Sequence, residues 1–218
     1  MGEYEKILSA DQAISYIKNG DTIMVGGFGL RGCPFTLEEA LLRSGKKELT
    51  IISNDLNSPG IGLGKLLQNH QIKSLIGNYY NWNKEAIRAR NRGEIDITLI
   101  PQGTFAEAIR AGAYGIPAFF VEASYGTTLG TGKEVRTFNG KEYVLEYALH
   151  ADVALIKAHK ADKIGNLVYS KTARNFNPMM AAAADFTIAV VEEIVEVGNL
   201  RPDEIITPHL FVDAIVEG

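Results

Sequence analysis

The chain has 218 residues, of which 46% are hydrophobic and 22% charged, with a formal net charge of −4 and one cysteine. This composition is ordinary for a globular protein with a sizeable core, and we expect one domain over residues 1–218. It excludes an internal disulfide and offers no basic run for nucleic acid, no membrane span and no apolar signal segment, so we expect a cytoplasmic protein.

Short apolar runs alternate with helical patterns through the first half of the chain. We expect helices beginning at Asp11 and at Thr36, where Glu39 completes a capping-box spacing, and helices in "NKEAIRARNRG" and "TFAEAIRAG" that end in glycine. The apolar runs predict strands buried on both faces: 21–27, 49–54, 74–80, 97–103 and 118–124. The alternation predicts an α/β fold, an open and mainly parallel sheet with flanking helices.

The middle of the chain departs from this alternation. Asn139-Gly140 lies between two β-rich runs, which is typical of a type I′ hairpin. After it, "ADVALIKAHKA" predicts another buried strand, and "MMAAAADFTIAVVEEIV" predicts a short helix followed by a late strand. We therefore expect a β-hairpin excursion from one sheet.

The stretch "MVGGFGLRGCP" (24–34) contains a G-x-G-x-x-G pattern from Gly27 to Gly32, directly after a predicted strand. Such glycines let a backbone turn sharply and approach a ligand, and this pattern occurs in dinucleotide-binding loops. A tight turn without a ligand is the alternative. Asp55 stands near the position of a ribose-binding acid, but Pro34 and the expected helix start at Thr36 make the loop too long for that motif.

Polar residues at predicted strand ends are the other candidates for a site. Asn54-Asp55 and Gln102 follow two strands, at the edge where open α/β sheets place ligands, although Asn and Asp also favour turns. Arg174 in "ARNFNP" has a planar fork suited to a phosphate or carboxylate, with a subunit contact or loop packing as the alternative.

No residue pattern supplies a nucleophile with its base, or a metal site. Cys33 precedes a helix without a nearby histidine in the sequence, and we interpret it as structural. The four histidines lack metal-ligand spacing, and Lys133 and Lys141 are interpreted as solvated charges. Conventional nucleophilic catalysis is therefore not visible in this chain.

Five blocks in this order resemble a known family: "GGFGLRGCP", "SND", "IPQGTFAEAIRAG", "GKE" and "KTARNFNP". From about residue 5 to residue 215 the chain is similar to the α subunit of family I 3-oxoacid CoA-transferases. The resemblance implies a NagB/RpiA-like α/β fold and the transfer of CoA from an acyl-CoA (acetyl-, butyryl- or succinyl-CoA) to an acid such as acetoacetate. CoA is then a substrate, and no permanently bound cofactor is implied.

The resemblance also implies that the nucleophile lies on another chain. In the family a glutamate in a Ser-Glu-Asn-Gly type motif of the β subunit performs ping-pong catalysis, and this sequence has no such motif. An αβ pair, as an α2β2 heterotetramer, is implied, and the single chain is expected to be inactive.

Site residues carry over position by position. Asn54 and Asp55 resemble the pair that lines the acyl or carboxylate pocket, where the second place is often Asn. Gln102 resembles a glutamine that donates a hydrogen bond to the thioester oxygen. The family's CoA-binding loop corresponds to Gly26, Gly27, Phe28, Gly29, Leu30, Arg31 and Gly32.

Two stretches depart from the family pattern. The segments "GNYYNWNKE" and "FFVEASYGT" bear on the acyl preference, which therefore stays open. Two other hypotheses remain: an NAD(P)-linked oxidoreductase using the glycine pattern, and a non-catalytic binder of acyl-CoA or sugar phosphate that shares only the fold.

Overall fold

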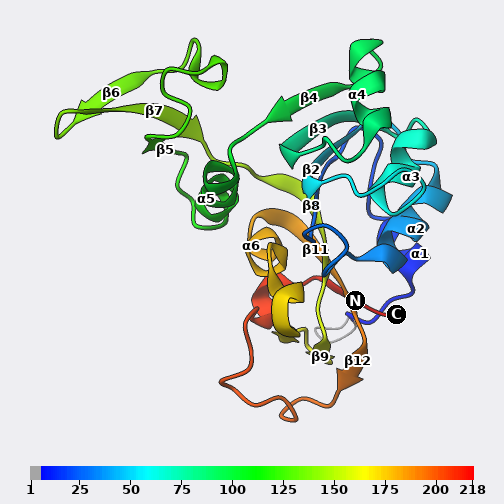
Figure 1. The fold of residues 1–218 in the computed structure, drawn as a ribbon. Helices are drawn as coiled ribbons and strands as arrows, with labels where there is room; N and C mark the ends of the chain where they lie inside the picture. The colour runs from blue at the N-terminus through cyan, green and yellow to red at the C-terminus, as the bar shows by residue number, and fades with distance from the viewer. Residues whose placement is uncertain (1–5) are drawn as a thin grey trace.

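The computed structural model describes residues 6–218. Residues 1–5, which contribute to the expectation about a signal segment, lie outside the described part. Seven strands form the central sheet in the order β13-β11-β8-β1-β2-β3-β4, and every neighbouring pair is parallel (Figure 1). Their bounds are β1 Thr22–Val25, β2 Leu49–Asp55, β3 Ile72–Tyr79, β4 Asp96–Leu99, β8 Ala151–Lys157, β11 Ala184–Val191 and β13 Ala214–Glu217. The predicted open parallel sheet is confirmed.

Helices cover both faces of this sheet. The bounds are α1 Ala10–Ile14, α2 Phe35–Ser44, α3 Leu63–Gln68, α4 Lys84–Asn91, α5 Gln102–Ala113 and α6 Asn177–Ala182. Strand side chains alternate between two cores, as the two-residue period requires. Ile23 and Val25 pack with α1 to α4, whereas Met24 packs with α5 and α6. In the described part of the chain, no helix has the length and apolar character needed to cross a membrane.

The helix starts differ from the predicted ones. Ser9 caps α1 and forms a capping box with Gln12, so Asp11 lies inside the helix. Helix α2 begins at Phe35 behind Pro34, without a side-chain cap, so the expected Thr36–Glu39 capping box is wrong. The Pro34 carbonyl accepts the first helical hydrogen bonds, and the ring already restricts the backbone there.

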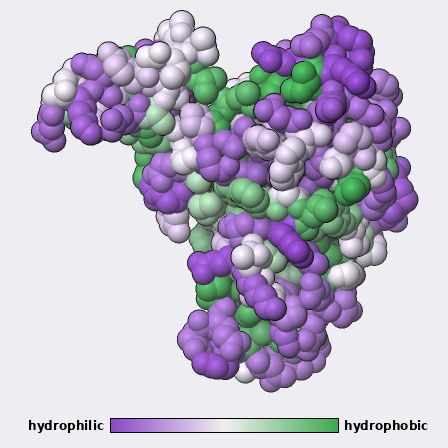
Figure 2. All heavy atoms as spheres, viewed as in Figure 1, coloured by the Kyte–Doolittle hydropathy of each residue, from purple (hydrophilic) through white to green (hydrophobic). Residues whose placement is uncertain are grey.

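The predicted hairpin belongs to a separate three-stranded sheet that we call the arm. It comprises β5 Ala118–Val121, β6 Val135–Phe138 and β7 Lys141–Tyr147, all antiparallel. Asn139 and Gly140 have φ of 51° and 76°, which confirms the type I′ turn. In Figure 1 the arm projects from the body beside α5, and in Figure 2 its outer surface is largely hydrophilic or intermediate in hydropathy.

Two strand predictions are wrong, one in its placement and the other in its burial and length. The run 118–124 contributes β5 to the arm instead of the parallel sheet, because its apolar residues pair with β7 and stay half-exposed. The run 97–103 yields only the mostly exposed edge strand β4, since nothing pairs with its outer side in the central sheet. A third sheet, β10-β9-β12, holds Leu167–Val168, Lys160–Asp162 and Glu193–Val195.

Candidate active site

The glycine-rich loop (residues 26–34) leaves β1 at the carboxyl edge of the sheet. Its tip is a two-residue turn in which the Phe28 N–H donates to the Arg31 carbonyl at 3.0 Å and the Arg31 N–H donates back at 3.1 Å. Gly29 has φ +57°, which favours glycine at this turn. The side chains of Phe28, Leu30 and Arg31 are exposed, so the tip faces solvent.

The Asp55 carboxylate holds the tip of this loop from below. One oxygen, Oδ2, accepts hydrogen bonds from the Gly29 N–H at 2.7 Å and from Asn54 Nδ2 at 3.0 Å. The other, Oδ1, accepts from the Asn57 backbone N–H at 3.0 Å. Because Asp55 is 7% exposed and both its oxygens are engaged, its carboxylate organises the loop in this structure.

Asn57 and Cys33 hold the same turn through its carbonyl group. Asn57 Nδ2 donates to the Gly29 oxygen at 2.6 Å, and the Cys33 thiol donates to it at 3.1 Å. Burial, followed by the nearby Glu38 carboxyl, raises the pKa of the thiol to about 12. The thiol therefore keeps its proton, which supports the structural interpretation of Cys33.

Two amides, one just before α6 and one at its first residue, hold the other side of the loop. Asn175 Oδ1 accepts from the Gly27 N–H at 3.2 Å. Asn177 Nδ2 donates to the Gly32 carbonyl at 3.0 Å, and its Oδ1 accepts from the Lys157 N–H at 3.0 Å. These contacts join the loop to a segment nearly 150 residues away.

Close packing explains why glycine occupies two of the loop positions. A Cβ at Gly26 would stand 1.8 Å from Asn177 Oδ1, and one at Gly32 would stand 2.4 Å from the Ala173 carbonyl oxygen. The cavity left between the loop and the strand ends measures only about 10 Å³. This is about the space of one water molecule, so the inner side of the loop has no room for a larger molecule.

A chain of side-chain hydrogen bonds links the loop to the start of α5. Gln102 Nε2 donates to Asn54 Oδ1 at 2.8 Å, and Asn54 in turn donates to Asp55. Asn54 is buried, whereas Gln102 is exposed at the first residue of α5. The structure therefore brings together Asn54, Asp55, Gln102 and the loop, and Gln102 is the member that faces solvent.

Aromatic residues flank the loop tip. Trp82 is 62% exposed and packs edge-on against Tyr79, with ring centroids 5.3 Å apart. A Cβ at Gly29 would stand 3.9 Å from the Trp82 ring, so this pair lies beside the turn. Tyr80, in contrast, is buried and donates its hydroxyl hydrogen to the Ser53 carbonyl. The aromatic stretch after β3 thus supplies both an exposed wall and a core anchor.

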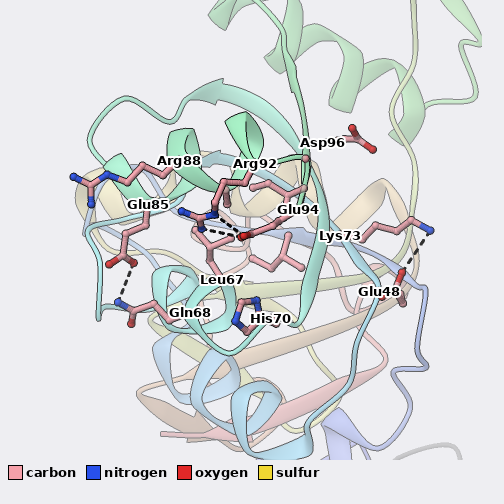
Figure 3. A pocket seen from close by; sticks show the side chains of 14 residues that line it. Glu48, Leu67, Gln68, His70, Lys73, Glu85, Arg88, Arg92, Glu94 and Asp96 are labelled. Carbon is pink, nitrogen blue, oxygen red and sulfur yellow. Dashed lines mark hydrogen bonds and ion pairs between the residues drawn. The ribbon is translucent and has the colours of Figure 1, made fainter.

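A much larger cavity lies at the opposite, amino edge of the sheet, and we call it the amino-edge groove. It holds about 670 Å³ and lies between the starts of β3 and β4 and helix α4 (Figure 3). Several of its polar side chains bond to one another, as Arg92 does with Glu94 at 2.8 Å and Gln68 with Glu85 at 2.9 Å. Size alone therefore does not mark the site, because parallel sheets place ligands at their carboxyl ends.

Other candidates from the sequence lie apart from this network. Arg174 is exposed on the segment that supplies Asn175 and Asn177. Lys133 is not merely solvated, since it pairs at 2.7 Å with the largely buried Glu146, whereas Lys141 stands 3.6 Å from Glu122. Within residues 6–218, no group of three or more potential metal-ligating His, Cys, Asp or Glu side chains gathers.

The residues that sequence reasoning missed are the buried acid Glu38 and the three amides Asn57, Asn175 and Asn177. Only the paired amides of "RNFNP" gave a signal, and that signal was attributed to Arg174. The dinucleotide hypothesis is wrong on two counts: Gly32 precedes the helix instead of lying in it, and Asp55 binds the loop itself. A ribose would have to displace that contact.

Comparison with known proteins agrees with this geometry. The family model for coenzyme A transferase matches residues 7–218. One subunit of the succinyl-CoA:3-ketoacid coenzyme A transferase from Helicobacter pylori strain J99 is 49% identical over 97% of this chain and 91% of its own length. The alpha subunit of the acetate CoA-transferase from Escherichia coli K12 is 43% identical over 97% of this chain and 96% of its own length.

A solved structure supports the fold. The acyl-CoA transferase YdiF from Escherichia coli O157:H7, crystallised as a thioester complex with CoA, superposes with a TM-score of 0.89 at 22% identity. It matches 99% of this chain, which spans about half of that longer chain, 48% of its length. The oxidoreductase alternative has no support in any of these comparisons. The chain belongs to the coenzyme A transferase family.

Proposed function

We propose that this chain is the α subunit of a heteromeric CoA-transferase. It moves CoA between a short-chain acyl-CoA, such as acetyl-, butyryl- or succinyl-CoA, and a 3-oxo acid such as acetoacetate. The relatives are themselves named as subunits of CoA-transferases, which supports both the reaction class and a β-subunit partner. CoA enters as a substrate, and we expect an α2β2 assembly without a permanently bound cofactor.

The reaction proceeds through a glutamate of the β subunit, as the family resemblance implies. That carboxylate attacks the thioester carbonyl, releasing CoA thiolate and forming a mixed anhydride. The thiolate then attacks the glutamyl carbonyl of the anhydride, which frees the first acid and leaves an enzyme–CoA thioester. The second acid repeats these steps in reverse, so that CoA leaves as a new thioester and the glutamate is regenerated.

The residues of this chain position the thioester for that attack. We expect the exposed Gln102 amide to donate a hydrogen bond to the thioester oxygen, on which negative charge develops. The glycine-rich loop offers its outer backbone to CoA, because its inner side is filled by its own contacts. The observation that carries this proposal is the hydrogen-bonded chain from Gly29 through Asp55 and Asn54 to Gln102.

The test uses the chain co-expressed with its β subunit, which we expect in the neighbouring reading frame. Gln102→Ala should lower kcat for transfer about 10²-fold, the usual effect of removing one oxyanion donor, while the complex still assembles. Gln68→Ala is the matched control, because it removes an amide at the opposite edge of the sheet. A wild-type kcat in Gln102→Ala would remove this residue from the mechanism.

Two further measurements complete the test of the proposed function. A panel of acceptor acids offered to the assembled enzyme identifies the acyl preference, and the absence of CoA transfer to every acid would reject the reaction class. A cytoplasmic location is likewise proposed, and fractionation of cells that express the chain checks it.

A further inference from the structure

Glu38 is a buried acid that the proposed reaction does not use. It lies on the inward face of α2, is 1% exposed, and is therefore closed to substrate. Its Oε2 atom has no hydrogen-bond partner among the described residues. Such an orphaned buried oxygen costs free energy unless something donates a hydrogen bond to it or it carries a proton itself.

A second orphaned oxygen lies near it. Asn57 Oδ1 is also buried without a partner in the described part of the chain, while its Nδ2 donates to Gly29 at 2.6 Å. The position that a Cβ of Gly62 would take lies 2.4 Å from Glu38 Oε2 and 2.5 Å from Asn57 Oδ1. Because both distances start from the same point, Glu38 Oε2 and Asn57 Oδ1 are closer to each other than the sum of the two distances.

Two facing acceptors leave each other unsatisfied unless one of them carries a proton. An amide oxygen only accepts, whereas a protonated carboxyl donates through its O–H. We propose that Glu38 is a neutral carboxylic acid in the folded protein, and that its Oε2–H donates to Asn57 Oδ1. This bond holds Asn57 against Gly29, so Glu38 is a positioning residue for the glycine-rich loop.

The surrounding charges favour the neutral form. Burial, then Glu39 on the same helix and Asp55 at the end of β2, raise the pKa of Glu38 to about 8, and the Leu63 N–H hydrogen bond opposes this. The Cys33 thiol faces it from the loop, and Lys65 of α3 pairs with Glu39. Loss of the proton would aim a negative charge at Asn57 Oδ1 and add to that of Asp55.

The Glu38 proton therefore stabilises the loop conformation from its buried side. Below about pH 8 the Glu38–Asn57–Gly29 connection is complete, and above that pH the carboxylate repels its partner. This role concerns the loop conformation alone and holds whichever thioester the loop binds. It therefore goes beyond the proposed function and can be tested without the β subunit.

The experiment uses the full chain and three variants. Glu38→Gln keeps a neutral donor of similar shape, Glu38→Leu removes the donor, and Glu94→Gln is the control, because Glu94 lies in the amino-edge groove and is not among the groups that shift the pKa of Glu38. Carbon-13 NMR follows the Glu38 carboxyl from pH 5 to pH 10. Amide hydrogen exchange at Gly29, corrected for the intrinsic rate at each pH, reports how firmly the turn is held.

We expect the Glu38 carboxyl to titrate above pH 7. Protection of the Gly29 amide should fall about fivefold above pH 8 in the wild type and in Glu94→Gln, the effect of losing one neutral hydrogen bond. Glu38→Gln should keep full protection throughout, and Glu38→Leu should lack it at every pH. A carboxyl that titrates below pH 6, or equal protection in the Gln and Leu variants, would overturn the proposal.

Discussion

Polar side chains are buried at one edge of the central sheet and exposed at the other. At the carboxyl edge, Asn54, Asp55 and Asn57 are 3–7% exposed, and their hydrogen bonds hold the glycine-rich loop. At the amino edge, the groove is far larger, but its charges pair on the surface, as Lys73 does with Glu48 at 3.6 Å. Buried polar groups that hydrogen-bond to one another, more than cavity volume, therefore indicate where a site lies in this fold.

The largest predicted loss of stability comes from a comparison of two glycines with similar φ and different space around them. Gly32 and Gly93 have φ of +70° and +71°, but a Cβ at Gly32 would lie 2.4 Å from a backbone oxygen, whereas Gly93 has nothing within 4 Å. Gly93→Ala should cost about 1 kcal/mol for its left-handed backbone. Gly32→Ala should cost about 3 kcal/mol more, because it also overpacks the loop.

Urea unfolding of both variants checks this difference. Equal urea midpoints for the two variants would mean that the loop accommodates the added methyl group without loss of stability. The carboxyl edge would then be no more tightly packed than the amino edge.

The second prediction removes one carboxylate from each edge. Asp55→Ala leaves the N–H groups of Gly29 and Asn57 without their acceptor, and we expect a loss of about 2–3 kcal/mol in the free energy of unfolding. Asp96→Ala removes an exposed carboxylate at the amino edge and should change it by less than about 0.5 kcal/mol. Denaturant titration measures both, and a costly Asp96→Ala would contradict the comparison.

The third prediction concerns pH. The pKa of Glu38 is about 8 in the folded chain against an ordinary 4.5, so between these values the unfolded chain has lost a proton that the folded chain keeps. The stabilisation is complete below pH 4.5 and declines as the pH rises to about 8, by at most about 1.4 kcal/mol per pH unit. Glu38→Gln should remove this slope.

Unfolding midpoints of the wild type and of Glu38→Gln from pH 5 to pH 9 measure the difference. Glu94→Gln is the control at the amino edge, because its hydrogen bond to Arg92 lowers the pKa of Glu94 and moves its titration below this window. Parallel curves for all three proteins would show that Glu38 titrates normally.

The smallest predicted effect tests the amino-edge groove alone. Lys73→Gln breaks an ion pair whose side chains are 62% and 66% exposed, and the free energy of unfolding should change by less than about 0.5 kcal/mol. Calorimetric melting of the variant checks this value. A larger loss of stability would show that the ion pairs of the amino-edge groove contribute to the fold despite their exposure.

Local patterns predicted much of the fold. The parallel strands and the Asn139-Gly140 turn are confirmed, because side-chain burial and positive φ are properties of a few adjacent residues. The placement of residues 118–121 was wrong, since an apolar run does not say which strand it will pair with. The start of α2 was wrong because Pro34 took the place of the expected cap.

The site was predictable only where a general rule applied. Asn54, Asp55 and Gln102 meet because parallel strands end at one edge, and their proximity is confirmed. Their contacts with substrate stay a prediction. Asn57 and Glu38 act through partners that only the tertiary fold brings near, so no spacing in the sequence predicts their roles. Asn177 stands in a motif whose signal was attributed to Arg174.

The separation of these partners along the chain has a consequence for folding kinetics. Gly27 and Gly32 are held by residues 148 and 145 positions away, so the loop gains these contacts only after β8 and α6 have docked on β1. We expect contacts between residues so far apart in the chain to form after the folding transition state. Their removal should then leave the folding rate nearly unaffected. Asn177→Ala should therefore act mainly by accelerating unfolding, and the unfolding and refolding rates of the variant would check this order of events.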